Sequence, residues 1–199
     1  MTRPLIIPLE TKSIPESAGS KASSLHKLAR KKYRIPRSWV CTWEAYDRYL
    51  NNDLEVLEQL EQQIKDILDS DASYAVRSSA NVEDHFEHSH AGQFKTVLNV
   101  SGIHPILQAI WAVWATARST QSEEYRGRIE TSEPVRMAVL IQEMIEPVYS
   151  GVAFSRNPIT FFDEILVEAV AGSGSRLVQD GVTPIRWVNK WNSWIEEPE

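Results

Sequence analysis

The residues best suited to binding phosphate lie in one short stretch, the sequence YAVRSSA at positions 74–80. Arg77 offers a planar, permanently charged guanidinium that can bind two phosphate oxygens at once, and two serine hydroxyls follow it. The loop sequence HAGQ at 90–93 comes next, and its glycine would let backbone N–H groups approach a phosphate closely. A structural alternative is an ion pair across a turn from Arg77 to Glu83 or Asp84, and the spacing alone favours neither interpretation.

The elements that would position these residues follow from the hydrophobic pattern. A strand that begins at Tyr74 and stops at the serine pair leads into a polar loop over 80–92, and a strand over 94–100 leaves that loop. Ahead of them, the pattern predicts a strand at 5–7, a helix over 20–32, an extended segment at 39–42, a helix from a Thr42 cap to Leu50, and a helix over 53–68 with Asp53 as N-cap.

A helix over 104–118 is apolar on two faces, which is typical of a mostly buried helix and places Trp111 and Trp114 in the core. Strands are expected at 137–141, 151–154 and 165–170. The tryptophans near the end favour a two-stranded hairpin around Lys190, formed by 187–189 and 191–195, over a surface that packs on a further lobe. The layout is helical first and sheet-rich later, as in an α/β or α+β protein.

Composition narrows the function classes. The formal net charge is −6 and the basic residues are scattered, so we expect no nucleic-acid partner; the cluster at 30–34 suits a helix C-terminus. Cys41 is the only cysteine and lies in an apolar run, which predicts a buried thiol and excludes an internal disulfide. With no apolar run long enough to span a membrane and no signal sequence, we expect a cytoplasmic protein without a membrane partner.

Three histidines share the loop after Arg77, and they could suggest a metal site. Short exposed loops with several histidines are more often solvated, so we predict no metal there. The residues concerned are His85, His88 and His90.

Several motifs make the chain similar to a known family, the ATP-binding domains of phosphoenolpyruvate synthase and pyruvate phosphate dikinase. The family pattern around Arg77 is A-V-R-S-S-A, an E-D pair, an A-G-Q loop and a strand ending L-N-V. Before it come G-G-K-A, V-P-x-G-F and T-x-x-A-Y, and after it A-V-x-V-Q-x-M, S-G-V-x-F-x-x-x-P and E-A-x-x-G-x-G-E. This chain has AVRSSA at 75–80, ED at 83–84, AGQ at 91–93, LNV at 98–100, GSKA at 19–22, IP at 35–36, TWEAY at 42–46, AVLIQEM at 138–144, SGVAF at 150–154 with Pro158, and EA at 168–169 with Gly172 and Gly174.

The resemblance implies an α+β, ATP-grasp-like nucleotide-binding domain with a helical N-terminal half, a mostly antiparallel sheet and a truncated second lobe. The whole chain, 1–199, would be the first part of that domain, helix-rich to about 135 and sheet-rich from about 136.

The resemblance also assigns roles to individual residues. Lys21 and Arg77 would be catalytic, with Lys21 reaching the phosphates and Arg77 clamping the β- and γ-phosphates. Gly92 and Gln93 would cover the triphosphate. The remaining ATP-binding positions would be the adenine hinge and one weaker phosphate contact, namely Gln142, Glu143, Met144 and Ile145, with Arg156. Met144 and Ile145 could equally be core residues.

The family's reaction implies ATP and Mg²⁺, a carrier histidine on a separate phosphohistidine domain, and pyruvate or a related acceptor held by a third domain. The Mg²⁺ ligands are expected downstream, and the C-terminal lobe and the other two domains are expected in the same chain or on a partner, so we expect this stretch alone to be inactive. One departure is Ser175, which replaces the acid after the second glycine of the family's turn. The alternative function is a non-catalytic module that binds a nucleotide or a partner protein.

Overall fold

The computed structural model describes residues 4–69, 71–81, 95–125, 135–174, 182–191 and 193–196, with only the backbone of 119–125. Two compact units divide the chain, Met1–Met144 and Ile145–Glu199. Of the loop predicted over 80–92, the structure describes only the first two positions, so the three histidines lie outside the described residues. Phe94 and Ser175 lie outside them as well.

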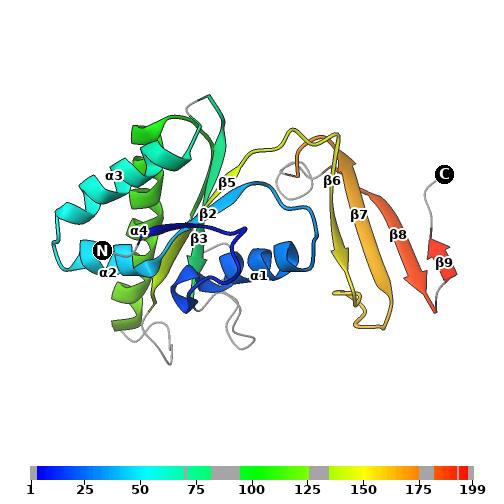
Figure 1. The fold of residues 1–199 in the computed structure, drawn as a ribbon. Helices are drawn as coiled ribbons and strands as arrows, with labels where there is room; N and C mark the ends of the chain where they lie inside the picture. Colours follow the sequence, from blue (N-terminus) through cyan, green and yellow to red (C-terminus); the bar gives the residue numbers. More distant parts are fainter. Residues whose placement is uncertain are drawn as a thin grey trace. The chain divides into compact units, whose positions relative to one another are not determined.

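The first unit combines helices with one antiparallel sheet. Its elements are β1 (Ile6–Pro8), the 3-10 turn η1 (Glu16–Ala18), α1 (Gly19–Arg30), β2 (Ser38–Cys41), α2 (Trp43–Leu50), α3 (Glu55–Ile67), β3 (Tyr74–Ala80), β4 (Thr96–Val100), α4 (Ile103–Tyr125) and β5 (Met137–Glu143). The strand order is β1-β2-β5-β3-β4, so β5, late in sequence, lies at the centre. In Figure 1, α1 lies on one side of this sheet and α3 and α4 lie on the other.

The face of the sheet toward α2, α3 and α4 carries the main core. Alternate residues of β5 point into it, because side chains in a strand alternate between faces: Met137, Val139 and Ile141 join this cluster. Trp114 of α4 is fully buried there and packs against Tyr46, with ring centroids 5.8 Å apart. Each large apolar side chain buried in this way stabilises the fold by about 1.5–3 kcal/mol.

On the opposite face, α1 and the turn before it contribute small residues to the packing. Ala138 and Leu140 of β5 pack with Ala18 and Ala22 in a separate cluster. Gly19 begins α1 with a φ of 75°, and a Cβ there would come within 1.8 Å of the Ser79 carbonyl oxygen. Only glycine permits both this backbone conformation and this close approach.

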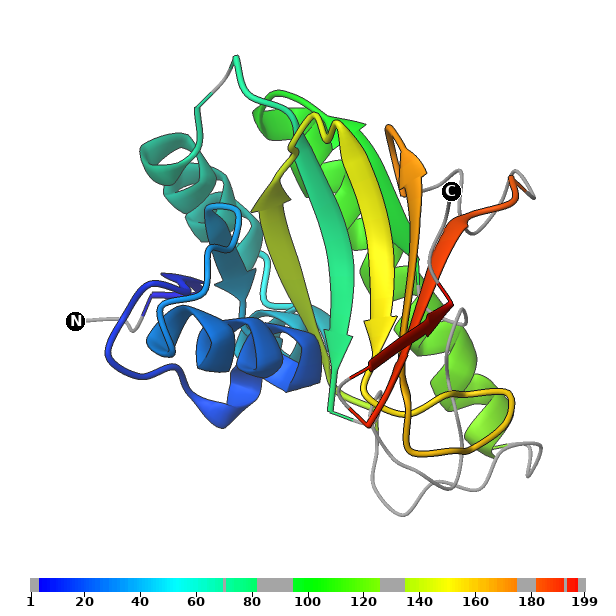
Figure 2. The same ribbon diagram turned by 90° about the vertical axis from the view of Figure 1, so that its right-hand side faces the viewer.

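The second unit is a four-stranded antiparallel sheet, drawn yellow to red in Figure 2. Its strands are β6 (Tyr149–Phe154), β7 (Ile165–Ala171), β8 (Ile185–Lys190) and β9 (Ser193–Glu196). Few of its large apolar side chains are buried; Leu166, Val170 and Val188 are among them. Many others are exposed, including Tyr149, Ile159, Phe161, Trp191 and Ile195.

The fold agrees with the α+β prediction, with four α-helices and antiparallel strand pairs in the described part. The C-terminal hairpin is confirmed, since β8 pairs with β9, but its turn is not at Lys190 as predicted: Lys190 is the last residue of β8 and lies opposite Ser193. Cys41 is buried as predicted, and burial raises the pKa of its thiol. Among the described residues, no helix is both long enough and apolar enough to cross a membrane.

Two local predictions on the first unit are wrong. The strand does not stop at the serine pair but continues to Ala80, because Ser78 and Ser79 pair with Val139 and Ala138 of β5. Trp111 is 38% exposed and lies outside the core, whereas Trp114 is buried as predicted.

The helix starts also differ from expectation. The helix after Thr42 begins as predicted, but no side-chain hydrogen bond from Thr42 caps it. The next helix begins at Glu55 with Leu54 at the N-cap position, one residue later than expected. Asp53 still satisfies a helix N–H, because its Oδ1 accepts a hydrogen bond from Glu55 N at 3.1 Å.

Candidate functional site

A line of polar side chains crosses the α1-covered face of the first sheet. Strand pairing sets it up, because Gln142 of β5 lies opposite both Ser38 of β2 and Ala75 of β3. Arg77 comes two residues after Ala75 and therefore projects from the same face. Arg77 Nη1 donates to Gln142 Oε1 at 3.4 Å, and Gln142 Nε2 donates to Ser38 Oγ at 3.1 Å.

The guanidinium of Arg77 has hydrogen-bond donors that can still bind a further acceptor. Its one side-chain partner among the described residues is the neutral amide of Gln142, and none of the described carboxylates pairs with it. Its Nε is buried and has no hydrogen-bond partner in this part of the chain. A buried N–H without a partner costs folding free energy, so binding of an acceptor such as a phosphate oxygen at this donor is favourable. Glu83 and Asp84, the predicted alternative partners, lie outside the described residues.

Lys21 is held beside the same strand by the way α1 begins. Ser79 Oγ accepts a hydrogen bond from Ala22 N at 3.1 Å and donates to Ala18 O at 2.8 Å, which satisfies one of the first N–H groups of the helix. Ser20 Oγ donates to Ala80 O at 3.1 Å. Docked in this way, Lys21 reaches β3, and its Nζ donates to Ser78 Oγ at 3.2 Å.

The structure thus gathers Lys21, Arg77 and Gln142, which are far apart in sequence, around β3. Of the two serines that follow Arg77, Ser79 is fully buried and anchors α1.

In the segment predicted as an adenine hinge, two backbone N–H groups already donate hydrogen bonds to other residues of the protein. Glu143 N–H donates to Arg37 O at 2.9 Å, and Met144 N–H donates to Ser73 O at 2.8 Å. The Glu143 carboxylate also pairs with Arg37 Nη1 at 3.0 Å. Ile145 opens the second unit, and its side chain is 61% exposed. These two backbone N–H groups are therefore not available to adenine in this arrangement.

The remaining predicted residues lie elsewhere. Gly92 and Gln93 fall outside the described residues. Arg156 belongs to the second unit, is exposed, and donates through Nε to Phe161 O at 2.8 Å. The next residue, Asn157, is buried and donates to Glu164 Oε1 at 2.6 Å, a hydrogen bond that links the two ends of the loop 157–164.

Ser38 is the site residue that the sequence did not reveal. Its Oγ lies between Gln142 and Pro36, donating to Pro36 O at 2.7 Å. One signal was present: Ser38 follows Ile35-Pro36 where the V-P-x-G-F pattern has glycine. A polar residue in place of glycine in an otherwise apolar buried strand indicates a hydrogen-bonding role.

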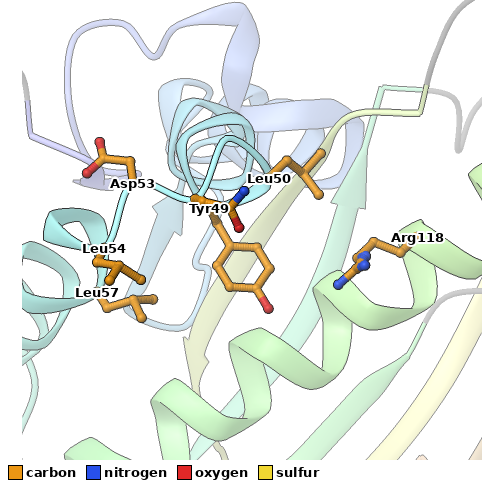
Figure 3. A pocket seen from close by; sticks show the side chains of 7 residues that line it. Tyr49, Leu50, Asp53, Leu54, Leu57 and Arg118 are labelled. Atoms are coloured by element: carbon orange, nitrogen blue, oxygen red, sulfur yellow. The ribbon is translucent and has the colours of Figure 1, made fainter.

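A hollow of about 160 Å³ lies among α2, α3 and α4, in the layer that covers the opposite face of the sheet from Arg77. In Figure 3 the side chains of Tyr49 and Arg118 point into the same space, bordered by Leu50, Leu54 and Leu57. None of the predicted ATP-binding residues borders it. In the described ranges, no three of His, Cys, Asp or Glu come together as metal ligands.

Comparison with known proteins gives a consistent result. The family described as pyruvate phosphate dikinase, AMP/ATP-binding domain matches residues 54–197. A probable phosphoenolpyruvate synthase of Methanothermobacter thermautotrophicus is 30% identical over 218 residues, covering 87% of this chain and 32% of that protein.

Two further relatives are phosphotransferases. An uncharacterized phosphotransferase of Bacillus subtilis is 33% identical, with 90% of this chain and 24% of that protein covered. A rifampicin phosphotransferase of Streptomyces sviceus is 30% identical, with 88% of this chain and 25% of that protein covered. The chain thus spans a third or less of the length of these relatives, and the alignments extend over more of it than the family match does.

Proposed function

The chain belongs to the family of pyruvate phosphate dikinase AMP/ATP-binding domains, and from this premise we propose that its first unit holds the phosphates of ATP through Arg77 and Lys21. The observation that carries the proposal is the guanidinium of Arg77, which has a neutral partner and a buried Nε–H without one in the described part. Lys21, whose Nζ donates to the Ser78 hydroxyl of the same strand, is proposed to supply a second positive charge.

The proposed architecture is an ATP-grasp-like domain, helix-rich to about residue 135 and sheet-rich beyond. Arg77 contacts the β- and γ-phosphates, where a bidentate cation stabilises the charge that develops during phosphoryl transfer. Gly92 and Gln93, which lie outside the described residues, are proposed to bind the triphosphate, and Arg156 is proposed as a weaker phosphate ligand.

The adenine ring is proposed to bind at the segment 142–145. The N–H groups of Glu143 and Met144 are hydrogen-bonded within the protein, so the ring would contact other atoms of this segment. Ile145 offers an exposed apolar side chain for this contact. The apolar side chains of Met144 and Ile145 would stack on the ring.

In the whole protein, we propose, ATP phosphorylates a carrier histidine with release of AMP and phosphate, and the phosphoryl group then passes to pyruvate or another hydroxyl acceptor. Mg²⁺ would neutralise phosphate charge in that reaction. In this proposal its ligands, the phosphohistidine domain and the acceptor domain are supplied by sequence other than these 199 residues, in the same chain or on a partner.

Calorimetric titration with ATP tests the proposal. Arg77→Ala should weaken ATP binding by about tenfold to a hundredfold, since a hydrogen bond to a charged group contributes about 1.5–3 kcal/mol. Arg30→Ala, which removes an exposed arginine from the last turn of α1, is the matched control and should change affinity less than twofold. Equal affinities for the wild type and Arg77→Ala would contradict it, as would the absence of ATP binding by the longest protein that the gene encodes.

A non-catalytic nucleotide-binding or partner-binding module is the second candidate. The observation that favours it is Ser175, which stands where the family's turn has an acid. The coding sequence beyond residue 199 discriminates the two functions. A D-x-E-W-A segment followed by a phosphohistidine domain would exclude the non-catalytic module, and neither function predicts phosphate transfer by this chain alone.

A further inference from the structure

The buried hydroxyl of Ser38 determines which way the Gln142 side chain points. Ser38 is 3% exposed and Gln142 is 8% exposed, so neither side chain readily exchanges its partner for water. A serine hydroxyl has one hydrogen to donate, and Ser38 donates it to Pro36 O at 2.7 Å. The hydroxyl can therefore only accept from Gln142, which it does from Nε2 at 3.1 Å.

The direction of this chain of hydrogen bonds has a consequence for Arg77. A glutamine amide has one donor end and one acceptor end. With Nε2 committed to Ser38, Oε1 must face the other way, and it accepts from Arg77 Nη1 at 3.4 Å. If the amide turned over, two donors would face each other and the guanidinium would lose its partner.

We infer that Ser38 is a positioning residue for triphosphate binding, acting through Gln142 to orient the guanidinium of Arg77. The inference rests on the proposed function of Arg77. Holding the guanidinium by one Nη leaves Nε and the other Nη for phosphate oxygens, which is the edge that suits two-oxygen binding. Glycine at this position, as in the family pattern, could not orient the amide in this way.

The first test needs no nucleotide. In the ¹H–¹⁵N spectrum of the wild-type chain, the Nε–H signal of Arg77, assigned by its loss in Arg77→Lys, should exchange slowly with water. Ser38→Ala removes the hydroxyl and should speed this exchange by about threefold or more, because the guanidinium loses its fixed partner. Unchanged exchange would overturn the inference whatever the outcome of nucleotide titrations. Ser38→Gly is the second variant if Ser38→Ala does not fold.

The second test measures affinity for ATP and for AMP. Ser38→Ala should weaken ATP binding by about fivefold, the worth of one hydrogen bond, and leave AMP binding within about twofold, because AMP lacks the phosphates that Arg77 contacts. A merely structural role would weaken both ligands alike, and that result would overturn the inference.

A double-mutant cycle isolates the path through Gln142. In a Gln142→Ala background, Ser38→Ala should cause no further loss of ATP affinity, since the side chain that transmits its effect is gone. Additive losses would contradict the inference. Failure of the proposed function is distinguishable, because the wild type would then bind no ATP while the exchange measurement still reports on Ser38.

Discussion

The two faces of the first sheet come from the same strands but differ in the side chains that they present: one face forms the main core and the other carries the proposed phosphate-binding residues. Toward α2, α3 and α4 the sheet presents large apolar side chains that meet Trp114 and its neighbours in a continuous core. Toward α1 it presents a smaller apolar cluster that includes Ala138 and Leu140, together with the polar line from Ser38 to Arg77. Small residues let the helix start approach the strand closely, and that approach places Lys21 on β3. Stability and ligand binding should therefore respond separately to substitutions on the two faces.

The largest effect is expected for Trp114→Ala on the core face. Trp114 is fully buried and its ring packs against both Tyr46 and Tyr49, so its removal leaves a cavity. We expect the free energy of unfolding in urea to fall by about 3–5 kcal/mol. The ATP affinity of the folded protein should remain within about twofold of the wild-type value.

Trp111→Ala is the matched control for this prediction. It removes the same side chain from the same helix, but Trp111 is 38% exposed, so the loss of stability should stay below about 1 kcal/mol. Equal losses in the two variants, or a tenfold loss of ATP affinity in Trp114→Ala, would mean that the two faces are not independent.

Gly19→Ala should have the next largest effect and should alter both properties. The new Cβ meets the Ser79 carbonyl oxygen at 1.8 Å, and the φ of 75° is unfavourable for alanine. With a ψ of 177°, Gly19 lies in a region that is essentially restricted to glycine, and this conformational cost and the overpacking together predict about 3 kcal/mol of lost stability. ATP affinity should also fall, because α1 must move and take Lys21 with it.

Gly102→Ala separates these two causes. Gly102 has a similar φ of 85°, but the Cβ of an alanine there would have Pro105 Cδ as its nearest atom, at an ordinary 3.7 Å. Only the conformational cost of about 1–2 kcal/mol should remain, and ATP affinity should not change. If Gly19→Ala costs no more than Gly102→Ala, close packing of α1 on β3 does not constrain this face.

Parts of this organisation could be predicted from sequence because they depend on local patterns. Helical spacing located α3, and the almost continuous apolar run located β5, since both patterns record which positions face the core. The motif around Arg77 identified the nucleotide-binding family. The local pattern could not decide which of two apolar faces of α4 meets the sheet. Trp111 was therefore assigned to the core, although of the two tryptophans only Trp114 is buried.

The partners within the site could not be predicted in the same way. Arg77 and Gln142 are 65 residues apart, and they meet only because β5 inserts between β2 and β3. Strand order and register are tertiary properties, so one sequence does not reveal which residues lie opposite each other. Ser38 was missed for this reason, and the anchoring of α1 by Ser79 could not be predicted because the helix that packs on this strand was not known.

The smallest effect is expected at Asp53, which lies in the layer of α2 and α3 and should influence stability alone. Arg48 Nε donates to Asp53 Oδ2 at 2.6 Å, and this hydrogen bond holds the pKa of the carboxyl below its ordinary value of 3.8. A carboxyl whose pKa is lower in the folded state stabilises the fold above the unfolded-state pKa. That contribution disappears as the pH falls through the folded-state pKa.

Urea unfolding of the wild type and Asp53→Asn across pH 6 to about 2 should show this dependence. The wild type should be slightly more stable at pH 6, and the difference should shrink towards zero at the acid end, because an exposed ion pair contributes little and only while ionised. Gln59→Ala removes the neighbouring bond from Arg48 Nη1 at 2.7 Å without removing a carboxyl, so its effect should depend far less on pH. ATP affinity at neutral pH should be the same in all three proteins, because these residues lie on the layer opposite Arg77. A loss of affinity in Asp53→Asn would show that the core-side layer also controls the phosphate-binding face.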